Sequence, residues 1–212
     1  MVGAPFSIVP CRRLRPSLHR LHANWICSMT LPNNNSGESG LTDEETTIIG
    51  IDPALRCTGY AAILLAGKQM EILDCGVIRN DAKERHSRCL YRIAGGIREL
   101  AERFQPQVGI IEGGFYGRNV KTAMVLGMVR GAILSVMAEY GMECYEYAPA
   151  KAKQMITGYG RASKEEIAQM MAGIFGIQVS HIPADATDAL SLCVCHGLLL
   201  STHNGVYLQD SV

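Results

Sequence analysis

The chain has 212 residues, 48% of them hydrophobic, and its formal net charge at pH 7 is zero. This length is enough for one sizeable α/β domain with room for an additional segment. Zero net charge excludes the global positive field of many DNA-binding proteins, so any nucleic-acid surface has to be local. No uninterrupted run of about 18 apolar residues is present, which argues against a transmembrane helix and a membrane partner.

The first 45 residues differ in composition from the rest of the chain. Several arginines precede Glu38, the first acidic residue, and apolar residues show no regular spacing. This pattern is typical of an organelle transit peptide. Alternatively, Met29 is the true start and residues 1–28 are an over-extended reading frame, which is the interpretation we favour. Because the stretch after Met29 is polar and reads as a disordered linker, we predict that residues 1–45 lie outside a folded domain at 46–204, with a tail at 205–212.

Three strands that are close in sequence begin the regular part of the chain. Their β-branched and apolar residues predict strands at 46–52, 57–66 and 69–79, with connections short enough for hairpins. The first strand ends at Asp52, because Pro53 has no N–H to donate to a further pairing. A carboxylate at the end of a buried strand needs a partner, although an Asp before Pro also commonly opens a turn.

Helices and strands alternate after this meander. Apolar residues at helical spacing predict helices at 83–104 and 119–140. A buried strand between these helices ends at Glu112, and another follows at 142–148. Further helices are expected at 150–157, 163–175 and 183–200. The order of the elements predicts an α/β fold with a mixed five-stranded sheet flanked by helices.

The helix expected at 119–140 is apolar on more than one side. Such a helix needs two partners, for example the sheet and another subunit. We therefore predict that this helix forms a two-fold dimer interface. The apolar residues that motivate this prediction include Ala123, Met124, Met128, Ala132 and Val136.

The cysteines do not form a disulfide framework. Most lie scattered in apolar segments, as is typical of reduced, buried thiols in a cytosol-like compartment. Cys193, Cys195 and His196 are close in sequence, but their spacing is not that of the usual zinc sites and no second pair accompanies them. We therefore favour core packing. His196 lies eight residues after Asp188, on nearly the same helix face, so it is either a core histidine or a residue that supports the acidic site behind its ligands.

Four acidic residues lie at the ends of expected elements in otherwise apolar stretches. Asp52 and Glu112 end strands, and Asp185 and Asp188 share a helix face because they are three residues apart. If the strand ends are neighbours, the carboxylates converge, and divalent cations remove their repulsion. Oxygen ligands in this number suit Mg²⁺ or Mn²⁺, and two ions about 4 Å apart can hold a scissile phosphate and activate water. Alternatively, these carboxylates only cap turns and helices, as the helix dipole favours for Asp185.

Several motifs resemble the RuvC family of Holliday-junction resolvases. They occur in the family's order from Ile48 to about His196 and read GIDPALRCTGYA, IIEGGFYGRN, KTAMVLGMVRGAI, YAPAKAKQMITGYGRASKEEI and PADATDAL. The resemblance implies an RNase H-like fold, a homodimer and magnesium-dependent nicking of four-way DNA junctions in recombination and repair. It also implies a RuvA–RuvB branch-migration complex as a partner. The implied location is the cytoplasm, or an organelle matrix if residues 1–28 are a transit peptide.

The resemblance also assigns roles to single residues. The implied ligands of two Mg²⁺ ions per subunit, for which Mn²⁺ can substitute, are Asp52, Glu112, Asp185 and Asp188. Phe115 matches the family's aromatic residue at the junction centre, while Lys153 and Lys164 match basic residues near the DNA. We also expect Lys153 to act near the scissile phosphate. Positive side chains in the loops around the acids would contact phosphates, unless they are only solvated surface: Arg118, Lys121, Lys151, Lys153, Arg161 and Lys164.

The chain departs from the family pattern at two places. Ala54 replaces the Gly usually found two residues after the first Asp, and Ala disfavours a positive φ. Gly113 and Gly114 follow Glu112 and loosen the loop that carries Phe115. Neither change removes a proposed ligand, but both bear on the geometry of the contacts with the junction.

Three other functions remain open from the sequence. The first is a different nuclease of the same fold, for example one that acts on RNA–DNA hybrids. The second is a non-catalytic junction-binding protein with a relic site, although the presence of all four acids argues against it. The third is an actin-like phosphotransferase with a similar strand meander, but the chain has no Gly-rich phosphate loop of P-loop spacing.

Overall fold

Six strands form one mixed sheet in the order β1-β4-β3-β2-β5-β6. The computed structural model describes residues 8–10, 45–113, 119–177 and 181–202. The strands are β1 (Ile8–Pro10), β2 (Glu45–Asp52), β3 (Cys57–Ala66), β4 (Gln69–Arg79), β5 (Val108–Glu112) and β6 (Glu143–Tyr147). Strands β2, β3 and β4 form the predicted antiparallel meander, and β5 and β6 run parallel to β2.

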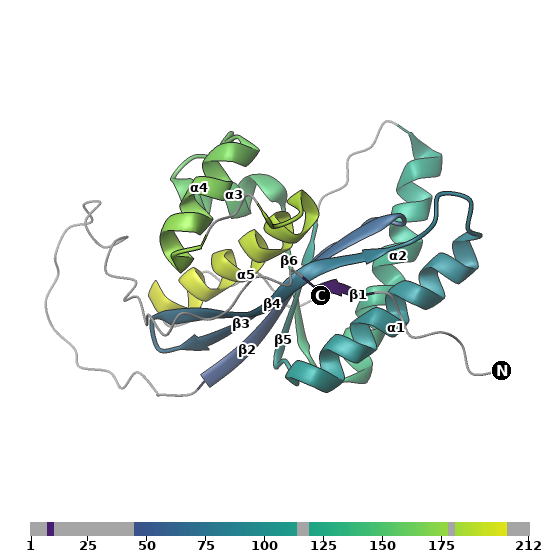
Figure 1. Ribbon diagram of the computed structural model, residues 1–212, viewed down its shortest axis with the longest axis horizontal. Coiled ribbons are helices and arrows are strands. Elements are labelled where there is room, and N and C mark those ends of the chain that lie inside the picture. The colour runs from purple at the N-terminus through teal and green to yellow at the C-terminus, as the bar shows by residue number, and fades with distance from the viewer. Residues whose placement is uncertain (1–7, 11–44, 114–118, 178–180, 203–212) are drawn as a thin grey trace, which may run out of the picture.

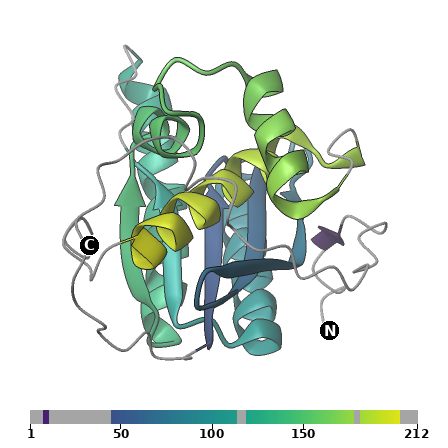
Figure 2. The same ribbon diagram turned by 90° about the vertical axis from the view of Figure 1, so that its left-hand side faces the viewer.

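Helices cover both faces of this sheet (Figure 1). The helices are α1 (His86–Phe104), α2 (Val120–Glu139), α3 (Pro149–Thr157), α4 (Lys164–Phe175) and α5 (Ala184–Thr202). Helices α1 and α2 pack on one face over a core that includes Ile49, Ile51 and Ile133. On the other face α5 lies across the strands, with α3 and α4 beside its N-terminal part (Figure 2). The predicted α/β architecture is therefore confirmed.

Local sequence signals account for several helix boundaries. Ser163 caps α4, and Glu166 completes the capping box that the sequence predicts. Asn119 caps α2 by accepting from the amides of Lys121 and Thr122. Gly96 lets α1 approach the sheet closely, because a Cβ at this position would lie 2.7 Å from Ile78 Cδ1.

The sheet has one strand more than the five that the sequence predicts. Strand β1 pairs antiparallel with β4 at the edge of the sheet and comes from the segment that we expected to lie outside the fold. Three residues are too few to show a hydrophobic period, so the pattern gave no sign of this strand. Gly76 permits the pairing, because a Cβ there would lie 2.3 Å from the Val9 carbonyl oxygen. The domain boundaries at 46–204 and 205–212 stay a prediction.

Helix α2 is long and apolar enough to span a membrane by length and composition alone, and it is the one such helix in the described part of the chain. The apolar run of this helix is interrupted by Lys121 and Arg130, so no uninterrupted stretch of about 18 apolar residues marks it in the sequence. Part of α2 packs against α1 and the sheet, with Val129 and Ile133 buried. The absence of a membrane partner stays a prediction.

Candidate active site

Two glycines in neighbouring strands allow α5 to lie directly against the sheet. A Cβ on Gly59 would lie 2.0 Å from the Asp185 carbonyl oxygen, and one on Gly50 would lie 2.4 Å from that of Ala189. Gly59 pairs with Asp52 across β2 and β3. The start of α5 therefore lies over the strand pair that carries the first acid. This role of Gly50 and Gly59 was not predicted, although a Gly inside a strand is a known signal of close backbone approach.

Asp52 and Glu112 end adjacent parallel strands. Ile51 pairs with Ile111, and the two acids are the next residues of β2 and β5. Their carboxyl groups lie close enough for Glu112 to raise the pKa of Asp52. The negative charge of Glu112 disfavours the charged form of the Asp52 carboxyl group. The convergence that the sequence predicts for these strand ends is present in the structure.

The pKa of Asp52 rises from its ordinary value of 3.8 to about 8. Burial is the largest cause, because it disfavours the charged form. The hydrogen bond with Glu112 and the negative charges of Glu112, Asp188 and Asp185 raise the pKa further. All four predicted acids therefore act on one point at the end of the sheet, and Asp52 holds a proton at neutral pH.

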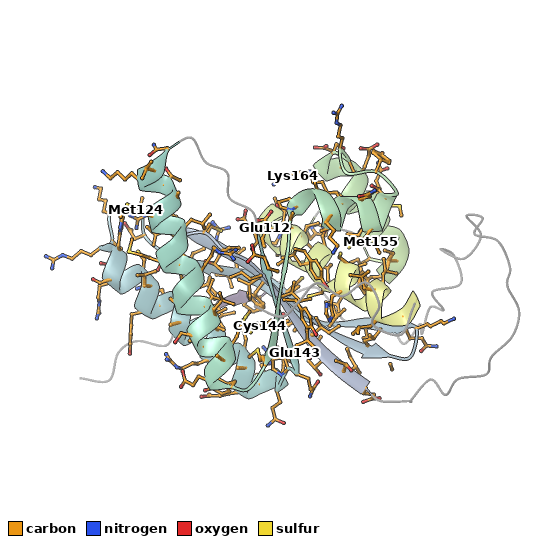
Figure 3. The ribbon with its side chains drawn as sticks, turned by 180° about the vertical axis from the view of Figure 1, so that it is seen from behind. Glu112, Met124, Glu143, Cys144, Met155 and Lys164 are labelled. Atoms are coloured by element: carbon orange, nitrogen blue, oxygen red, sulfur yellow. The ribbon has the colours of Figure 1, made fainter. Side chains whose placement is uncertain are left out.

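The two acids of α5 have other partners as well. The Lys164 ammonium donates to Asp188 Oδ2 at 2.9 Å, and this ion pair raises the pKa of Lys164. Burial, which is the largest cause, and the neighbouring Asp185 carboxyl group raise the pKa of the Cys57 thiol to about 11. Figure 3 shows Glu112 and Lys164 at the same end of the sheet, away from Glu143.

The four acids do not form a ready-made ligand cage. Within the described ranges, no group of three or more His, Cys, Asp or Glu side chains is arranged to hold one metal ion. The raised pKa of Asp52, which keeps that carboxyl group protonated at neutral pH, and the ammonium of Lys164 compensate part of the negative charge instead. A divalent cation could replace both, and an all-oxygen donor set is the type that Mg²⁺ and Mn²⁺ prefer. The residues fit such an ion in donor chemistry and total charge.

The structure separates the predicted basic residues into different environments. Lys153 lies in α3 and donates to the Ala162 carbonyl at 3.0 Å, so its ammonium also holds the turn before α4. Lys151 lies over the ring of Tyr147, with Nζ 5.2 Å from the centroid. Lys121 is exposed in the first turn of α2, and Arg161 is exposed before α4.

Two of the predicted DNA contacts cannot be placed. Phe115 and Arg118 lie outside the described residues, as does Gly114. Their assigned roles, including that of Phe115 at the junction centre, stay predictions.

The turn after Asp52 accommodates Ala54 without backbone strain. Among the described non-glycine residues only Gln105 has a positive φ, so Ala54 does not need the conformation that Gly would favour. Thr58 Oγ1 donates to the Ala54 carbonyl at 2.6 Å. Asn80 Nδ2 donates to the Leu55 carbonyl at 2.8 Å. These bonds hold the turn that leads from β2 into β3.

His196 lies in the core and does not reach the acids. Its side chain is 1% exposed, and Nδ1 lies 2.8 Å from the hydroxyl of Tyr147. The ring also packs against Tyr145, with the centroids 4.6 Å apart. Burial lowers the pKa of His196 to about 4, so the ring is neutral at pH 7. His196 is therefore a core histidine, and it does not support the acidic site from behind its proposed ligands.

Comparison with known proteins decides the family. The model of the family described as crossover junction endodeoxyribonuclease RuvC matches residues 48–196. The chain belongs to the RuvC family. A RuvC of Moorella thermoacetica is 40% identical to it over 149 residues, which cover 70% of this chain and 89% of the relative. The RuvC of Chlorobaculum parvum is 36% identical over 162 residues, covering 75% and 87%.

A solved RuvC structure has the same fold. The structure of T. thermophilus RuvC in complex with Holliday junction substrate superposes with a TM-score of 0.69 at 29% identity. The match covers 74% of this chain and 95% of that chain. The RNase H-like fold predicted from the motifs is therefore confirmed, and all four acids lie within the residues matched by the RuvC model.

Proposed function

We propose that this RuvC-family chain is a crossover junction endodeoxyribonuclease, which nicks four-way DNA junctions by hydrolysing phosphodiester bonds. The observation that carries the proposal is the effect of Glu112, Asp185 and Asp188 on the pKa of Asp52. Four acids from three elements meet at the end of the sheet, in a family whose members are named for this activity. Perturbed acids of this kind concentrate at catalytic sites.

The proposed cofactor is Mg²⁺, with two ions per subunit and Mn²⁺ as a substitute. Asp52, Glu112, Asp185 and Asp188 would hold the ions through their carboxylate oxygens. When bound, the ions supply a water that is acidic enough to act as a nucleophile, and positive charge near the attacking and leaving oxygens. The high pKa of Asp52 supports this assignment, because burial and three neighbouring acids both disfavour its negative charge and a bound cation would offset them.

The chain's own residues bind and orient the DNA. The proposed contacts are Lys151 and Lys153 on α3, Lys164 on α4 and Lys121 on α2, and the ion pair of Lys164 with Asp188 supports the position of Lys164 at the acidic site. Contacts of these side chains with phosphates position the duplex arms without reading sequence. Lys164 already neutralises Asp188 in the protein alone, so it can exchange that carboxylate for a phosphate when the acid gains another partner. Lys153 lies two residues after Lys151 on α3 and is proposed to act near the scissile phosphate.

We further propose that the chain is a homodimer, formed through the exposed face of α2. Val120, Met124 and Met128 are 73%, 67% and 45% exposed and recur every four residues. Gly127 and Gly131 have no atoms within 4 Å of an added Cβ, so a second helix can approach closely. A two-fold axis through this face would bury the same patch on both subunits and present two sites for paired nicking.

The assignment of Val136 to the predicted dimer face is wrong. Val136 is 1% exposed and packs in the subunit's own core with Ile133 and Met137. The sequence pattern could not separate the two apolar sides of α2, because nearly every position of this helix is apolar. Ala123 and Ala132 are half-buried at the edges of the exposed face.

The remaining assignments rest on the family alone. We propose a cytoplasmic location and a RuvA–RuvB branch-migration complex as partner. Family membership argues against a phosphotransferase, while the four acids argue against a binding protein with a relic site. A nuclease for RNA–DNA hybrids of the same fold differs from our proposal in substrate, and dimeric paired nicking distinguishes the two.

A cleavage assay tests the proposed function. Purified protein is incubated with a four-way junction, the matching linear duplex and an RNA–DNA hybrid, each with Mg²⁺ and with chelator. We expect symmetric paired nicks in the junction only, and only with Mg²⁺. Equal cleavage of the linear duplex or the hybrid, or no cleavage of the junction at any Mg²⁺ concentration, would overturn the proposal.

A further inference from the structure

Arg130 connects helix α2 with the strand end that carries Glu112. Its guanidinium donates to the main-chain carbonyl of Glu112 and, through Nη2, to Glu146 Oε2 at 2.6 Å. The side chains of Arg130 and Glu146 are 19% and 29% exposed. The ion pair is thus partly buried, where a charged pair is worth more than it is at the open surface.

Glu146 and Gly113 complete the contact from the neighbouring strand. Glu146 lies on β6, which runs parallel to β5 and pairs Tyr147 with Glu112. The amide of Gly113 donates to the Tyr147 carbonyl at 2.9 Å and extends the ladder by one residue. A Cβ on Gly113 would lie 2.1 Å from Glu146 Cγ. The absence of a side chain at Gly113 therefore gives Glu146 the space in which it meets Arg130.

This arrangement bears on Glu112 because it fixes the peptide that follows the acid. The carbonyl of Glu112 is the last acceptor on β5. Gly113 is the last residue described before the gap at 114–118. Arg130 donates a hydrogen bond to the Glu112 carbonyl, and the Gly113 amide donates one to the Tyr147 carbonyl. These two bonds hold the backbone on the C-terminal side of Glu112 from two directions. A side chain on a held backbone keeps its orientation, and groups behind ligands commonly affect metal affinity in this way.

The same arginine belongs to the helix that carries the exposed apolar face. Met128 lies two residues before Arg130 on α2 and is 45% exposed, whereas Arg130 turns toward β5 and β6. A displacement of α2 would therefore move the donor that holds the Glu112 carbonyl. Figure 3 shows α2, with Met124 near its start, beside the strands that end at Glu112.

We propose that Arg130 is a positioning residue for the acidic site. It holds the backbone of Glu112 in the orientation needed for metal binding, and it couples that orientation to the position of α2. The inference rests on the proposed function, since it concerns Glu112 as a metal ligand. The basis is the joint contact of one side chain with the Glu112 carbonyl and the Glu146 carboxylate.

The test compares three substitutions in the full chain. Arg130→Ala removes the contacts with the Glu112 carbonyl and with Glu146. Arg130→Lys keeps the positive charge, but its single ammonium lacks the branched guanidinium that donates to two acceptors at once. Arg98→Ala is the matched control, because it breaks an Arg–Glu pair between α1 and Glu139 at the far end of α2. Calorimetric titration with Mn²⁺, junction binding in chelator, thermal unfolding and the Mg²⁺ dependence of cleavage are measured for each.

We expect Arg130→Ala to weaken Mn²⁺ binding and raise the half-saturating Mg²⁺ concentration by about tenfold or more. Excess Mg²⁺ should restore much of the rate. Arg130→Lys should rescue stability but not metal affinity, while Arg98→Ala should leave metal affinity at the wild-type value. Junction binding in chelator and the dimer should persist in all three.

Two results would overturn the inference. One is an Arg130→Ala protein with wild-type Mn²⁺ affinity and Mg²⁺ dependence. The other is full recovery of metal affinity in Arg130→Lys, which would show that charge alone suffices. If the wild-type protein cleaves junctions, either of these results leaves the proposed function intact and refutes only the role of Arg130. A wild-type protein that does not cleave junctions would refute the proposed function itself.

Discussion

Asp52 and Glu112, sixty residues apart in sequence, end neighbouring parallel strands, where the Glu112 carboxyl group lies against Asp52 and raises its pKa. This contact makes the end of the sheet a site that is short of positive charge. The strand pairing brings the two acids together, while the close packing of α5 on Gly50 and Gly59 brings Asp185 and Asp188 to them. If Asp52 is a metal ligand as proposed, metal binding and protonation of its carboxyl group compete.

That competition predicts a pH dependence of metal binding. The pKa of Asp52 in the folded protein is raised from 3.8 to about 8. The protonated Asp52 side chain therefore contributes to the stability of the fold fully at a pH below 3.8, and this contribution is lost as the pH rises through about 8. Because metal binds the deprotonated form, Mg²⁺ affinity should rise by about tenfold per pH unit between about 6 and 8 and level off above. Half-saturating Mg²⁺ for cleavage at several pH values measures this, and a flat profile from pH 6 to 8 would be inconsistent with it.

The packing of α5 on β3 predicts that Gly59→Ala damages the site. The added Cβ would lie 2.0 Å from the Asp185 carbonyl oxygen, so the helix has to move. We expect a loss of about 1–3 kcal/mol in the free energy of unfolding. Because Asp185 and Asp188 move with the helix, cleavage should fall by about a hundredfold. Denaturant unfolding and a cleavage assay at saturating Mg²⁺ measure the two effects.

Gly173→Ala is the matched control for that substitution. Gly173 lies within α4, and an added Cβ would have no atom within 4 Å. Replacing Gly by Ala in an open helix position should stabilise by up to about 1 kcal/mol. Cleavage should stay at the wild-type rate. Loss of activity in both variants would point to a general sensitivity to glycine replacement and not to the position of α5.

The basic residues predict a salt-dependent contact with DNA. Lys153→Ala and Lys164→Ala should each weaken junction binding and lower the log–log salt slope by roughly one per lost phosphate contact. If Lys153 also acts near the scissile phosphate, its substitution should reduce cleavage more than binding. Lys68→Ala, in the exposed turn between β3 and β4, should change neither quantity. If junction binding and cleavage are unchanged in both the Lys153 and the Lys164 variant, these lysines do not contact the DNA.

The exposed face of α2 predicts the oligomeric state. Met128→Glu places a charge in the proposed two-fold interface and should shift the protein to monomers, which abolishes paired nicking. Met170→Glu on α4 is the control, since Met170 has a similar exposure of 37% compared with 45% for Met128. Sedimentation at working concentration measures the effect. A monomeric wild-type protein would remove the basis for this prediction.

Much of the fold was predictable because local signals agree with the final structure. The strand ending at Asp52, the strand ending at Glu112 and the capping box at Ser163 all lie where the residue pattern places them. Each depends on a few consecutive residues, such as β-branched runs or a cap with its partner three positions on. The sequence also selected the four acids, because carboxylates at the ends of apolar elements are unusual.

The remaining features depend on contacts between residues that are distant in sequence. The pair between Lys164 and Asp188, the Lys153 bond to the Ala162 carbonyl and the burial of Val136 follow from how helices pack. No local pattern specifies these partners. Strand β1 was missed because pairing with β4, and not the composition of its three residues, makes it a strand.

Asp52→Asn separates binding from chemistry and tests the central claim, that the acids support metal-dependent hydrolysis. The substitution keeps the shape of the side chain but removes the charge that a metal ion needs. Cleavage of a four-way junction in Mg²⁺ should fall by orders of magnitude, at about tenfold for each 1.36 kcal/mol of lost transition-state stabilisation. The same loss is expected for Glu112→Gln and Asp185→Asn, with Asp188→Asn the mildest because Asp188 lies a turn further into α5.

The deciding measurement is junction binding by gel shift beside junction cleavage in Mg²⁺, for Asp52→Asn and the wild-type protein. Binding depends on phosphate contacts elsewhere, so the variant should bind at least as tightly as the wild type when Mg²⁺ is absent. We predict retained junction binding together with cleavage reduced by orders of magnitude. An Asp52→Asn protein that cleaves the junction at the wild-type rate would contradict it.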